Sequence, residues 1–199
     1  MITHAFFDVG GVLGSNGWDR TERARAIAHF NLDEDFEARQ LELAADLETG
    51  RLSINEYLDS TVFYRPRSFG RDEFVNYMLA QSVPDLTCLA LVQRVAERGR
   101  VRLFTLNNES DLLNQHRITT FGLERLFEGF LSSCWLGARK PSRLIFERAL
   151  KIVQARPDQA LFVDDREQNI QAARALGIRT HHFVSTEELE PVLVRHGLL

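Results

Sequence analysis

The feature that most constrains the fold of this chain is a short apolar run that ends in polar side chains and occurs three times. The runs at residues 5–7, 101–106 and 160–163 lead into Asp8, into Asn107 and Asn108, and into Asp164 and Asp165. Short apolar runs without alternation are typical of strands buried on both faces of a parallel sheet. Because ligands bind outside the carboxyl ends of such strands, we expect these distant polar residues to share one site.

Between the first run and residue 84, the sequence carries helical signals only. Apolar residues recur every three or four positions, Ser53 and Glu56 have the spacing of a capping box, and Asp33 is placed to cap the second of several helices. A turn-prone link, Gly14 to Gly17, precedes this region. We therefore predict a helical-bundle cap domain, residues 15–84, inserted into a core domain of residues 1–14 and 85–199 and lying over the strand ends.

From residue 85 onward, helical and strand patterns alternate. Helices are predicted at 86–97, 109–120, 166–176 and within 187–196, with another that has Pro141 in its first turn, and strands at 101–106, 129–131, 160–163 and 178–183. Such alternation implies right-handed crossovers and a parallel sheet covered on both faces. The predicted fold class is α/β, with a Rossmann-like parallel sheet core in three layers (α/β/α) and an inserted helical-bundle cap.

Composition excludes several classes of function. The 199 residues carry a net charge of −4 and are 44% hydrophobic, ordinary values for a globular protein that give no basic surface for nucleic acid. No apolar stretch approaches the length needed to span a bilayer, and the N-terminus carries no charged leader. Cys88 and Cys134 lack metal-ligand spacing and fit reduced, buried thiols. We expect a cytoplasmic monomer or homodimer with no membrane or nucleic-acid partner.

The acidic residues at the strand ends suit a reaction at phosphorus or carbon. Asp8 is a candidate nucleophile, because an unprotonated carboxylate attacks readily when a cation offsets its charge. Asp164 and Asp165 would repel Asp8 unless a divalent cation joined them, and hard carboxylate ligands of this kind favour Mg²⁺. The structural alternatives are a turn carboxylate at Asp8 and a helix cap at Asp165.

Two further polar groups fit the same site. Lys140 precedes Pro141 at a predicted helix start, where its ammonium can neutralise a phosphoryl oxygen beside the helix N-terminus. Asn107 and Asn108 can donate hydrogen bonds to an oxyanion. The structural alternatives are an exposed lysine and asparagines that cap the next helix. The order of the polar strand ends along the chain favours a common site.

In these motifs the sequence resembles the haloacid dehalogenase-like hydrolase superfamily over essentially its whole length. The family's four motifs correspond to residues 8–12, 106–108, 138–141 (Ala-Arg-Lys-Pro) and 162–165, with Asn169 one helical turn after the last. The predicted cap resembles the small helical cap of the subfamily that includes sugar-1-phosphate phosphatases and the N-terminal phosphatase domain of epoxide hydrolases. Residues 48–58 also look like the cap segment of that branch.

The resemblance implies a Mg²⁺-dependent phosphatase that acts on a small phosphorylated metabolite. Asp8 would attack phosphorus and form an aspartyl phosphate, which water then hydrolyses, so that Asp8 and Lys140 are the catalytic residues. The implied metal ligands are Asp8, the Gly10 carbonyl, Asp164 and, directly or through water, Asp165, and the implied phosphate-binding residues are Asn107, Asn108 and Lys140.

Two positions depart from the superfamily pattern. Gly10 stands where phosphatases of this superfamily usually carry an aspartate that protonates the leaving oxygen and later activates water, and losing such a group typically costs about a hundred- to ten-thousand-fold in rate. We therefore hypothesise a leaving group that needs little protonation, such as the anomeric oxygen of a sugar 1-phosphate or an acyl phosphate. Members of the resembling branch also carry Gly at this position. Asn107 replaces a Ser or Thr, which keeps a donor but changes its reach.

Three other functions remain open at the level of sequence. A metal-independent 2-haloacid dehalogenase also uses an aspartate nucleophile, but it attacks carbon and leaves the pair Asp164 and Asp165 unexplained. A catalytically silent binding protein on the same fold would explain Gly10 and Asn107 as loss of function. The helical cap is also a candidate docking surface for a protein partner, a question that the fold alone does not decide.

Overall fold

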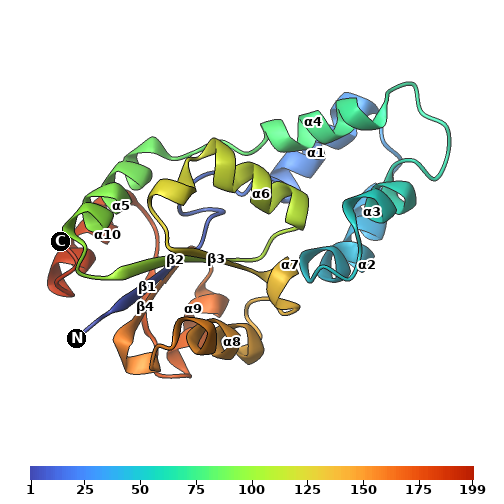
Figure 1. Cartoon of the computed structure of the whole chain (residues 1–199). Helices are drawn as coiled ribbons and strands as arrows, with labels where there is room; N and C mark the ends of the chain where they lie inside the picture. The colour runs from blue at the N-terminus through green and yellow to red at the C-terminus, as the bar shows by residue number, and fades with distance from the viewer.

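The computed structural model describes residues 1–199 and contains one five-stranded parallel sheet (Figure 1). Its strands are β1 (His4–Phe7), β2 (Arg102–Asn107), β3 (Gly129–Ser132), β4 (Ala160–Asp164) and β5 (Arg179–His182). They lie in the order β3-β2-β1-β4-β5, so the first strand of the chain is the central one, between β2 and β4. This arrangement confirms the predicted α/β class.

Helices cover both faces of the sheet (Figure 1). One face carries α5 (Leu86–Arg98), α6 (Asp111–Thr120) and α10 (Thr186–Arg195), and the other carries α8 (Arg143–Val153) and α9 (Glu167–Arg174). The short elements are α7 (Ser133–Leu136), η1 (Leu123–Arg125) and η2 (Pro157–Gln159). Successive strand side chains point to opposite faces, so Phe7 joins the apolar cluster of α5 and α10 while Phe6 joins that of α8 and α9.

The register of the strands brings their polar ends to one edge of the sheet. Phe7, the last residue of β1, pairs with Thr105 of β2 and with Val163 of β4. Because all three strands are parallel, the polar residues that follow these positions reach the same edge. The sheet therefore juxtaposes segments that lie about a hundred residues apart in the sequence.

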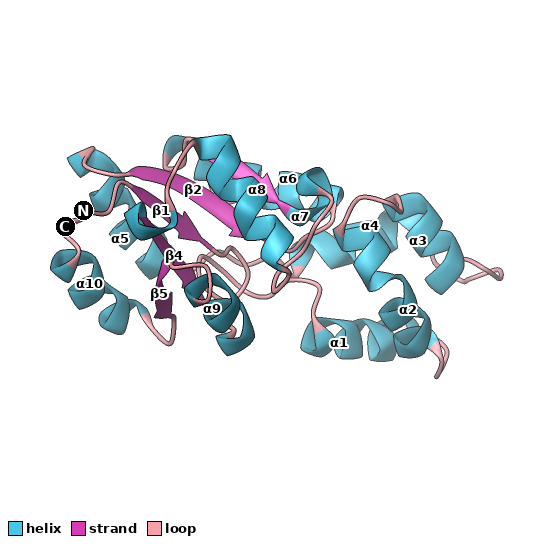
Figure 2. Ribbon diagram, turned by 90° about the horizontal axis from the view of Figure 1, so that it is seen from below, coloured by secondary structure: helices cyan, strands magenta, loops and turns pink.

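Four helices between β1 and α5 pack around an apolar cluster that is distinct from the two clusters of the sheet. They are α1 (Arg20–Phe30), α2 (Phe36–Glu48), α3 (Ile54–Thr61) and α4 (Arg71–Ala80). Figure 2 shows this bundle beyond the carboxyl ends of the strands. The two connections to the sheet lie side by side, since Ser15 N donates to Val83 O at 2.8 Å. The bundle corresponds in position to the predicted cap, whose domain boundaries stay a prediction.

Most helix boundaries agree with the sequence signals, and the capping box of Ser53 and Glu56 is formed at the start of α3. The prediction that Asp33 caps the second helix is wrong. Helix α2 begins at Phe36, and Asp33 instead accepts hydrogen bonds from Tyr64, Arg65 and Arg67. Two of these donors are guanidinium groups, which form charge-assisted hydrogen bonds with a carboxylate.

Two other helices begin later than predicted. Helix α8 starts at Arg143, and the hydroxyl of Ser142 accepts from Leu144 N, so Pro141 precedes the helix instead of lying in its first turn. Helix α6 starts at Asp111 and not at residue 109. As a consequence, the residues after β2, including Glu109, belong to a loop at the edge of the sheet.

The bundle depends on its aromatic cluster for stability. Phe74 is 0% exposed and packs against the rings of Trp18, Phe30 and Phe69. We expect Phe74→Ala to lower the free energy of unfolding by about 3–5 kcal/mol, because it removes buried apolar surface and leaves a cavity. Urea denaturation followed by circular dichroism measures this loss. The control is Leu41→Ala on α2, which is 65% exposed and should change stability by less than about 0.5 kcal/mol. Equal effects of the two substitutions would contradict the packing.

Candidate active site

A buried lysine joins two of the polar strand ends. The ammonium of Lys140, in the loop between α7 and α8, lies 2.9 Å from Asp8 Oδ1 and 2.6 Å from Asp164 Oδ2. The three residues are only 3%, 7% and 0% exposed, respectively. Asp8 follows β1 and Asp164 ends β4, so the neighbouring strands place both carboxylates beside the same cation.

The two carboxylates differ in how fully they are bound. Asp164 accepts hydrogen bonds from Arg166 N at 2.8 Å and from the Asn169 side chain at 2.9 and 3.0 Å, in addition to its contact with Lys140. Asp8 Oδ1 accepts from Val9 N at 2.8 Å and contacts Lys140, whereas Oδ2 has no hydrogen-bond partner. Asp164 is therefore fixed in place, and Asp8 keeps one oxygen that can attack a substrate.

Burial changes the proton affinities of these groups. It raises the pKa of Asp8 to about 7, an effect that Lys140 opposes and that the negative charges of Asp164 and Asp165 reinforce. Burial alone would lower the pKa of Lys140, but the neighbouring Asp8 and Asp164 hold it above its ordinary value. Burial and Asp164 also raise the pKa of Asp165. Lys140 is consequently a permanent cation at neutral pH, and a further cation would favour the ionised carboxylates.

Three carboxylates are close enough together to hold such a cation. Oxygen atoms of Asp8, Asp164 and Asp165 lie within 4.8 Å of one another. Asp165 Oδ1 is buried without a hydrogen-bond partner. The adjacent Gly11 has a φ of +75°, and a Cβ there would lie 2.3 Å from Asp165 Oδ2, so only glycine leaves room for this carboxylate. The donor set is that of a hard divalent cation such as Mg²⁺, which these residues fit.

The asparagine that ends β2, Asn107, and the one that follows it, Asn108, are engaged in different ways. The Asn108 side chain donates to Lys140 O at 2.9 Å and accepts from Lys140 N at 2.8 Å, so it fixes the backbone that carries the central lysine. Asn107 donates to the Asn114 side chain at 3.0 Å, and its Oδ1 is buried without a partner. The structure thus brings Asn108 to Lys140 and the carboxylates, while the role of both side chains in phosphate binding stays a prediction.

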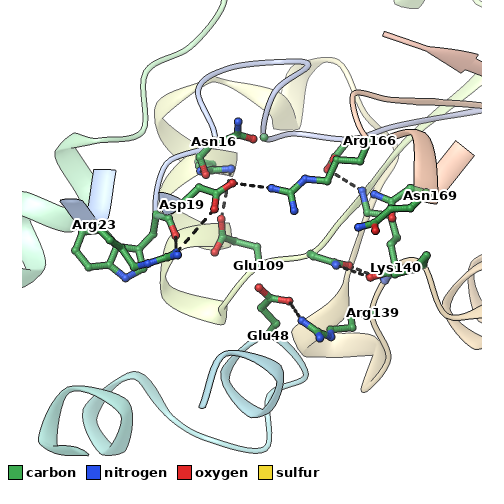
Figure 3. A pocket seen from close by; sticks show the side chains of 16 residues that line it. Asn16, Asp19, Arg23, Glu48, Glu109, Arg139, Lys140, Arg166 and Asn169 are labelled. Atoms are coloured by element: carbon green, nitrogen blue, oxygen red, sulfur yellow. Dashed lines mark hydrogen bonds and ion pairs between the residues drawn. The ribbon is translucent and has the colours of Figure 1, made fainter. Parts of the chain in front are cut away.

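A cavity of about 200 Å³ opens beside Asp8, between the sheet edge and the helical bundle. Its lining is almost entirely polar, and Trp18 is its one hydrophobic residue. Two ion pairs line this cavity (Figure 3). Asp19 pairs with Arg166 at 2.7 Å on one side, and Glu48 pairs with Arg139 at 3.0 Å on another. Both ion pairs join the bundle to the core.

Sequence reasoning missed these paired side chains. Asp19 and Arg166 are 147 positions apart, and Glu48 and Arg139 are 91 positions apart, so no local spacing links them. Trp18 both packs against Phe74 and lines the cavity. Only Asp19 had a local signal in the sequence, the polar residues 19–23 that follow the Gly14 to Gly17 link.

The chain belongs to the haloacid dehalogenase-like hydrolase family, because the family model matches residues 2–177. It is a hydrolase. Among curated proteins it is 22% identical over 195 residues to bifunctional epoxide hydrolase 2 of Sus scrofa, covering 88% of this chain and 35% of that protein. It is also 27% identical over 103 residues to a sesquiterpene phosphatase of Aspergillus oryzae, covering 52% of each. The chain thus spans about a third to a half of the length of these relatives.

Solved structures of low sequence identity share the fold. A family enzyme from Bacteroides thetaiotaomicron, crystallised in complex with magnesium and inorganic phosphate, superposes with a TM-score of 0.79 at 22% identity, covering 95% of this chain and 99% of that one. No helix of the present structure has the length and apolar character required to cross a membrane.

The raised pKa of Asp8 predicts how stability varies with pH in the absence of divalent cations. The folded protein holds a proton on Asp8 up to about pH 7, whereas the unfolded chain releases it near 3.8, so stability falls as pH rises between these values. One pKa unit corresponds to about 1.4 kcal/mol, and the total loss from this group is at most about 4 kcal/mol. Asparagine does not titrate, so Asp8→Asn should remove the part of the pH-dependent loss of stability that Asp8 causes.

Urea unfolding in EDTA at pH 5 and at pH 8 measures the effect. The difference between the native protein and Asp8→Asn isolates Asp8 from the other buried carboxyl groups. Parallel changes in the two proteins would contradict the raised pKa of Asp8.

Proposed function

We propose that this hydrolase is a Mg²⁺-dependent phosphatase that acts on a small phosphorylated metabolite through an aspartyl phosphate at Asp8. The observation that carries the proposal is the arrangement of Asp8, with one free oxygen, between a buried ammonium and two further carboxylates. Magnesium and phosphate bound to the related enzyme of Bacteroides thetaiotaomicron support it. Phosphoryl transfer requires little more from a protein than positioning and charge neutralisation, which this arrangement supplies.

In the proposed reaction, Asp8 Oδ2 attacks phosphorus and the bond to the leaving oxygen breaks. The Lys140 ammonium neutralises the phosphoryl oxygens, and Asn107 and Asn108 donate hydrogen bonds to them. Asp164 keeps the lysine in position. Mg²⁺ would be held by Asp8, the Gly10 carbonyl, Asp164 and Asp165, and when bound it neutralises phosphoryl charge.

The cavity favours a small, hydrophilic substrate. A volume of about 200 Å³ and a polar lining fit a sugar-sized group better than a long apolar chain such as a terpene. Residues 15–84 would act as a cap that supplies part of this lining. Within this class we propose a sugar 1-phosphate, because Gly10 provides no acid and an anomeric oxygen leaves with little protonation.

A 2-haloacid dehalogenase is the alternative enzyme on this fold. It would share the nucleophile Asp8, but its reaction at carbon gives no reason for three carboxylates that gather around one point. A catalytically silent protein would retain the fold without turnover. We propose a cytoplasmic location, because Cys88 and Cys134 are free thiols. We also propose that the protein is a monomer or a homodimer.

Metal dependence and substrate class are tested together. With MgCl₂, the protein should release phosphate from sugar 1-phosphates, and EDTA should abolish this activity while added Mg²⁺ restores it. Sugar 6-phosphates and farnesyl phosphate serve as comparison substrates and should be poorer. Vigorous turnover of farnesyl phosphate with none of the sugar phosphates would contradict the substrate class, and chloride release from 2-chloropropionate in EDTA would favour the dehalogenase.

The nucleophile is tested by substitution. Asp8→Asn keeps the shape of the side chain but removes its nucleophilic charge, so phosphatase activity should fall by at least about a thousand-fold, a loss in the range reported for essential groups. The control is Asp158→Asn, an exposed surface position 66% accessible, which should retain activity. Retention of magnesium-dependent turnover by Asp8→Asn would rule out the aspartyl phosphate.

A further inference from the structure

The proposed reaction leaves one task without a residue. An anomeric leaving group departs with little protonation, but the aspartyl phosphate at Asp8 must still be hydrolysed, and this second step needs a base for water whatever the substrate is. Gly10 has no side chain for this task. The need for such a base rests on the proposed function.

Two carboxylates on the bundle side of the cavity form ion pairs with the core and are partly exposed. Asp19 accepts from the backbone at the start of α1 and pairs with Arg166, and its side chain is 38% exposed. Glu48, at the end of α2, pairs with Arg139 and is 30% exposed. Both connect the bundle to the core.

Glu109 has a different environment. It lies in the loop that follows β2, the neighbour of the central strand β1. Glu109 is only 9% exposed, yet it lines the cavity next to Asp8. Glu109 Oε1 accepts from Ser110 N at 3.0 Å, and Oε2 lies 3.4 Å from Arg117 Nη1. Figure 3 shows its carboxylate within the cavity, between the bundle residues and Lys140.

The same arginine relates Glu109 to the position of the missing group. Arg117 Nη1 lies 3.3 Å from the point where a Cβ on Gly10 would be. The Arg117 side chain therefore takes up space next to Gly10 into which a side chain at that position would extend, and Glu109 is the ion-pair partner of this arginine. A carboxylate that follows the neighbouring strand thus lines the same cavity as Gly10, the position at which the superfamily pattern has an aspartate, and is linked to it through Arg117.

We propose that Glu109 is the general base that activates water for hydrolysis of the aspartyl phosphate. Its carboxylate takes a proton from a water molecule, and the water oxygen forms a bond to phosphorus. The bond between phosphorus and the Asp8 oxygen breaks, and its electron pair returns to the Asp8 carboxylate. Inorganic phosphate leaves, and Glu109 gives up the proton to solvent before the next turnover.

The surroundings of Glu109 suit this role. Burial raises the pKa of Glu109, the positive charge of Arg117 opposes the rise, and the negative charge of Glu48 adds to it. A base works best when its pKa lies nearer to the working pH than that of an exposed carboxylate. Arg117 also donates to Asn16 O at 2.8 Å and to Ser82 Oγ at 3.2 Å. The two connections that lead into the bundle thus fix Arg117, and Arg117 in turn positions Glu109.

Burst kinetics of Glu109→Gln test the proposal. Glutamine keeps the size and the hydrogen-bonding capacity of the side chain but cannot take a proton. With p-nitrophenyl phosphate and MgCl₂, this variant should release about one p-nitrophenolate per active site and then turn over at least about 100-fold more slowly than the native protein. KM should fall together with kcat, and intact-mass analysis should detect a phosphorylated protein that the native enzyme does not accumulate.

Glu128→Gln is the matched control, because Glu128 also pairs with an arginine, Arg102 at 2.7 Å, but on the surface. It should show native kinetics. Native turnover by Glu109→Gln, or slow turnover without a phosphorylated protein, would overturn the role of Glu109. If the native protein itself releases no p-nitrophenolate, or if Asp8→Asn still does, the proposed function fails instead.

A second variant keeps the proposal testable should glutamine disturb the loop. Glu109→Ala leaves space for a small carboxylate, and formate should speed the decay of the phosphorylated protein at least tenfold. A folded Glu109→Ala whose phosphorylated form decays at the same rate with and without formate would contradict the inference.

Discussion

The contact of the buried Lys140 ammonium with Asp8 and Asp164 is the interaction on which the site depends. Removing one partner of a buried ion pair costs about 3–5 kcal/mol, whereas an apolar replacement of the whole group is often neutral. The charges therefore do not explain the stability of the sheet. They fit the proposed role of the site, in which the Lys140 ammonium, beside the free oxygen of Asp8, binds an anionic ligand.

The fold supplies the positions of these charges with few specialised parts. β1 lies in the centre of the sheet, so its last residue has a strand end on each side. β4 contributes a carboxylate held by the backbone and by Asn169, and the loop before α8 contributes the lysine, held by the side chain of Asn108. The helical bundle then closes the space above the strand ends, and its ion pairs with the core leave a small polar cavity.

Much of this fold could be predicted from sequence, because strands and helices leave periodic and terminal signals. The apolar runs that end in Asp8 and Asp164 marked two neighbouring strands, and the pair Ser53 and Glu56 marked a helix start that the structure contains. The shared edge of a parallel sheet then follows from chain topology. The catalytic, phosphate-binding and metal-binding roles assigned to these residues stay predictions.

Contacts between loops could not be predicted in the same way. Asp33 has the sequence position of a helix cap, but three side chains more than thirty residues later compete for it. The approach of Arg117 to Gly10 depends on the path of the connection into the bundle, which no periodicity encodes. A missing side chain in a motif can thus be judged only when the structure shows which distant groups take up its space.

In the proposed site, Asp8, Asp164 and Asp165 hold one divalent cation beside a phosphate group bound by Lys140. A crystal structure of the protein with Mg²⁺ and beryllium trifluoride would show this arrangement. We expect one Mg²⁺ coordinated by Asp8 and Asp164, with Asp165 in direct or water-mediated contact, and the trifluoride attached to Asp8 Oδ2 and in contact with the Lys140 ammonium. Mg²⁺ bound elsewhere, or a trifluoride that does not contact Asp8, would contradict it.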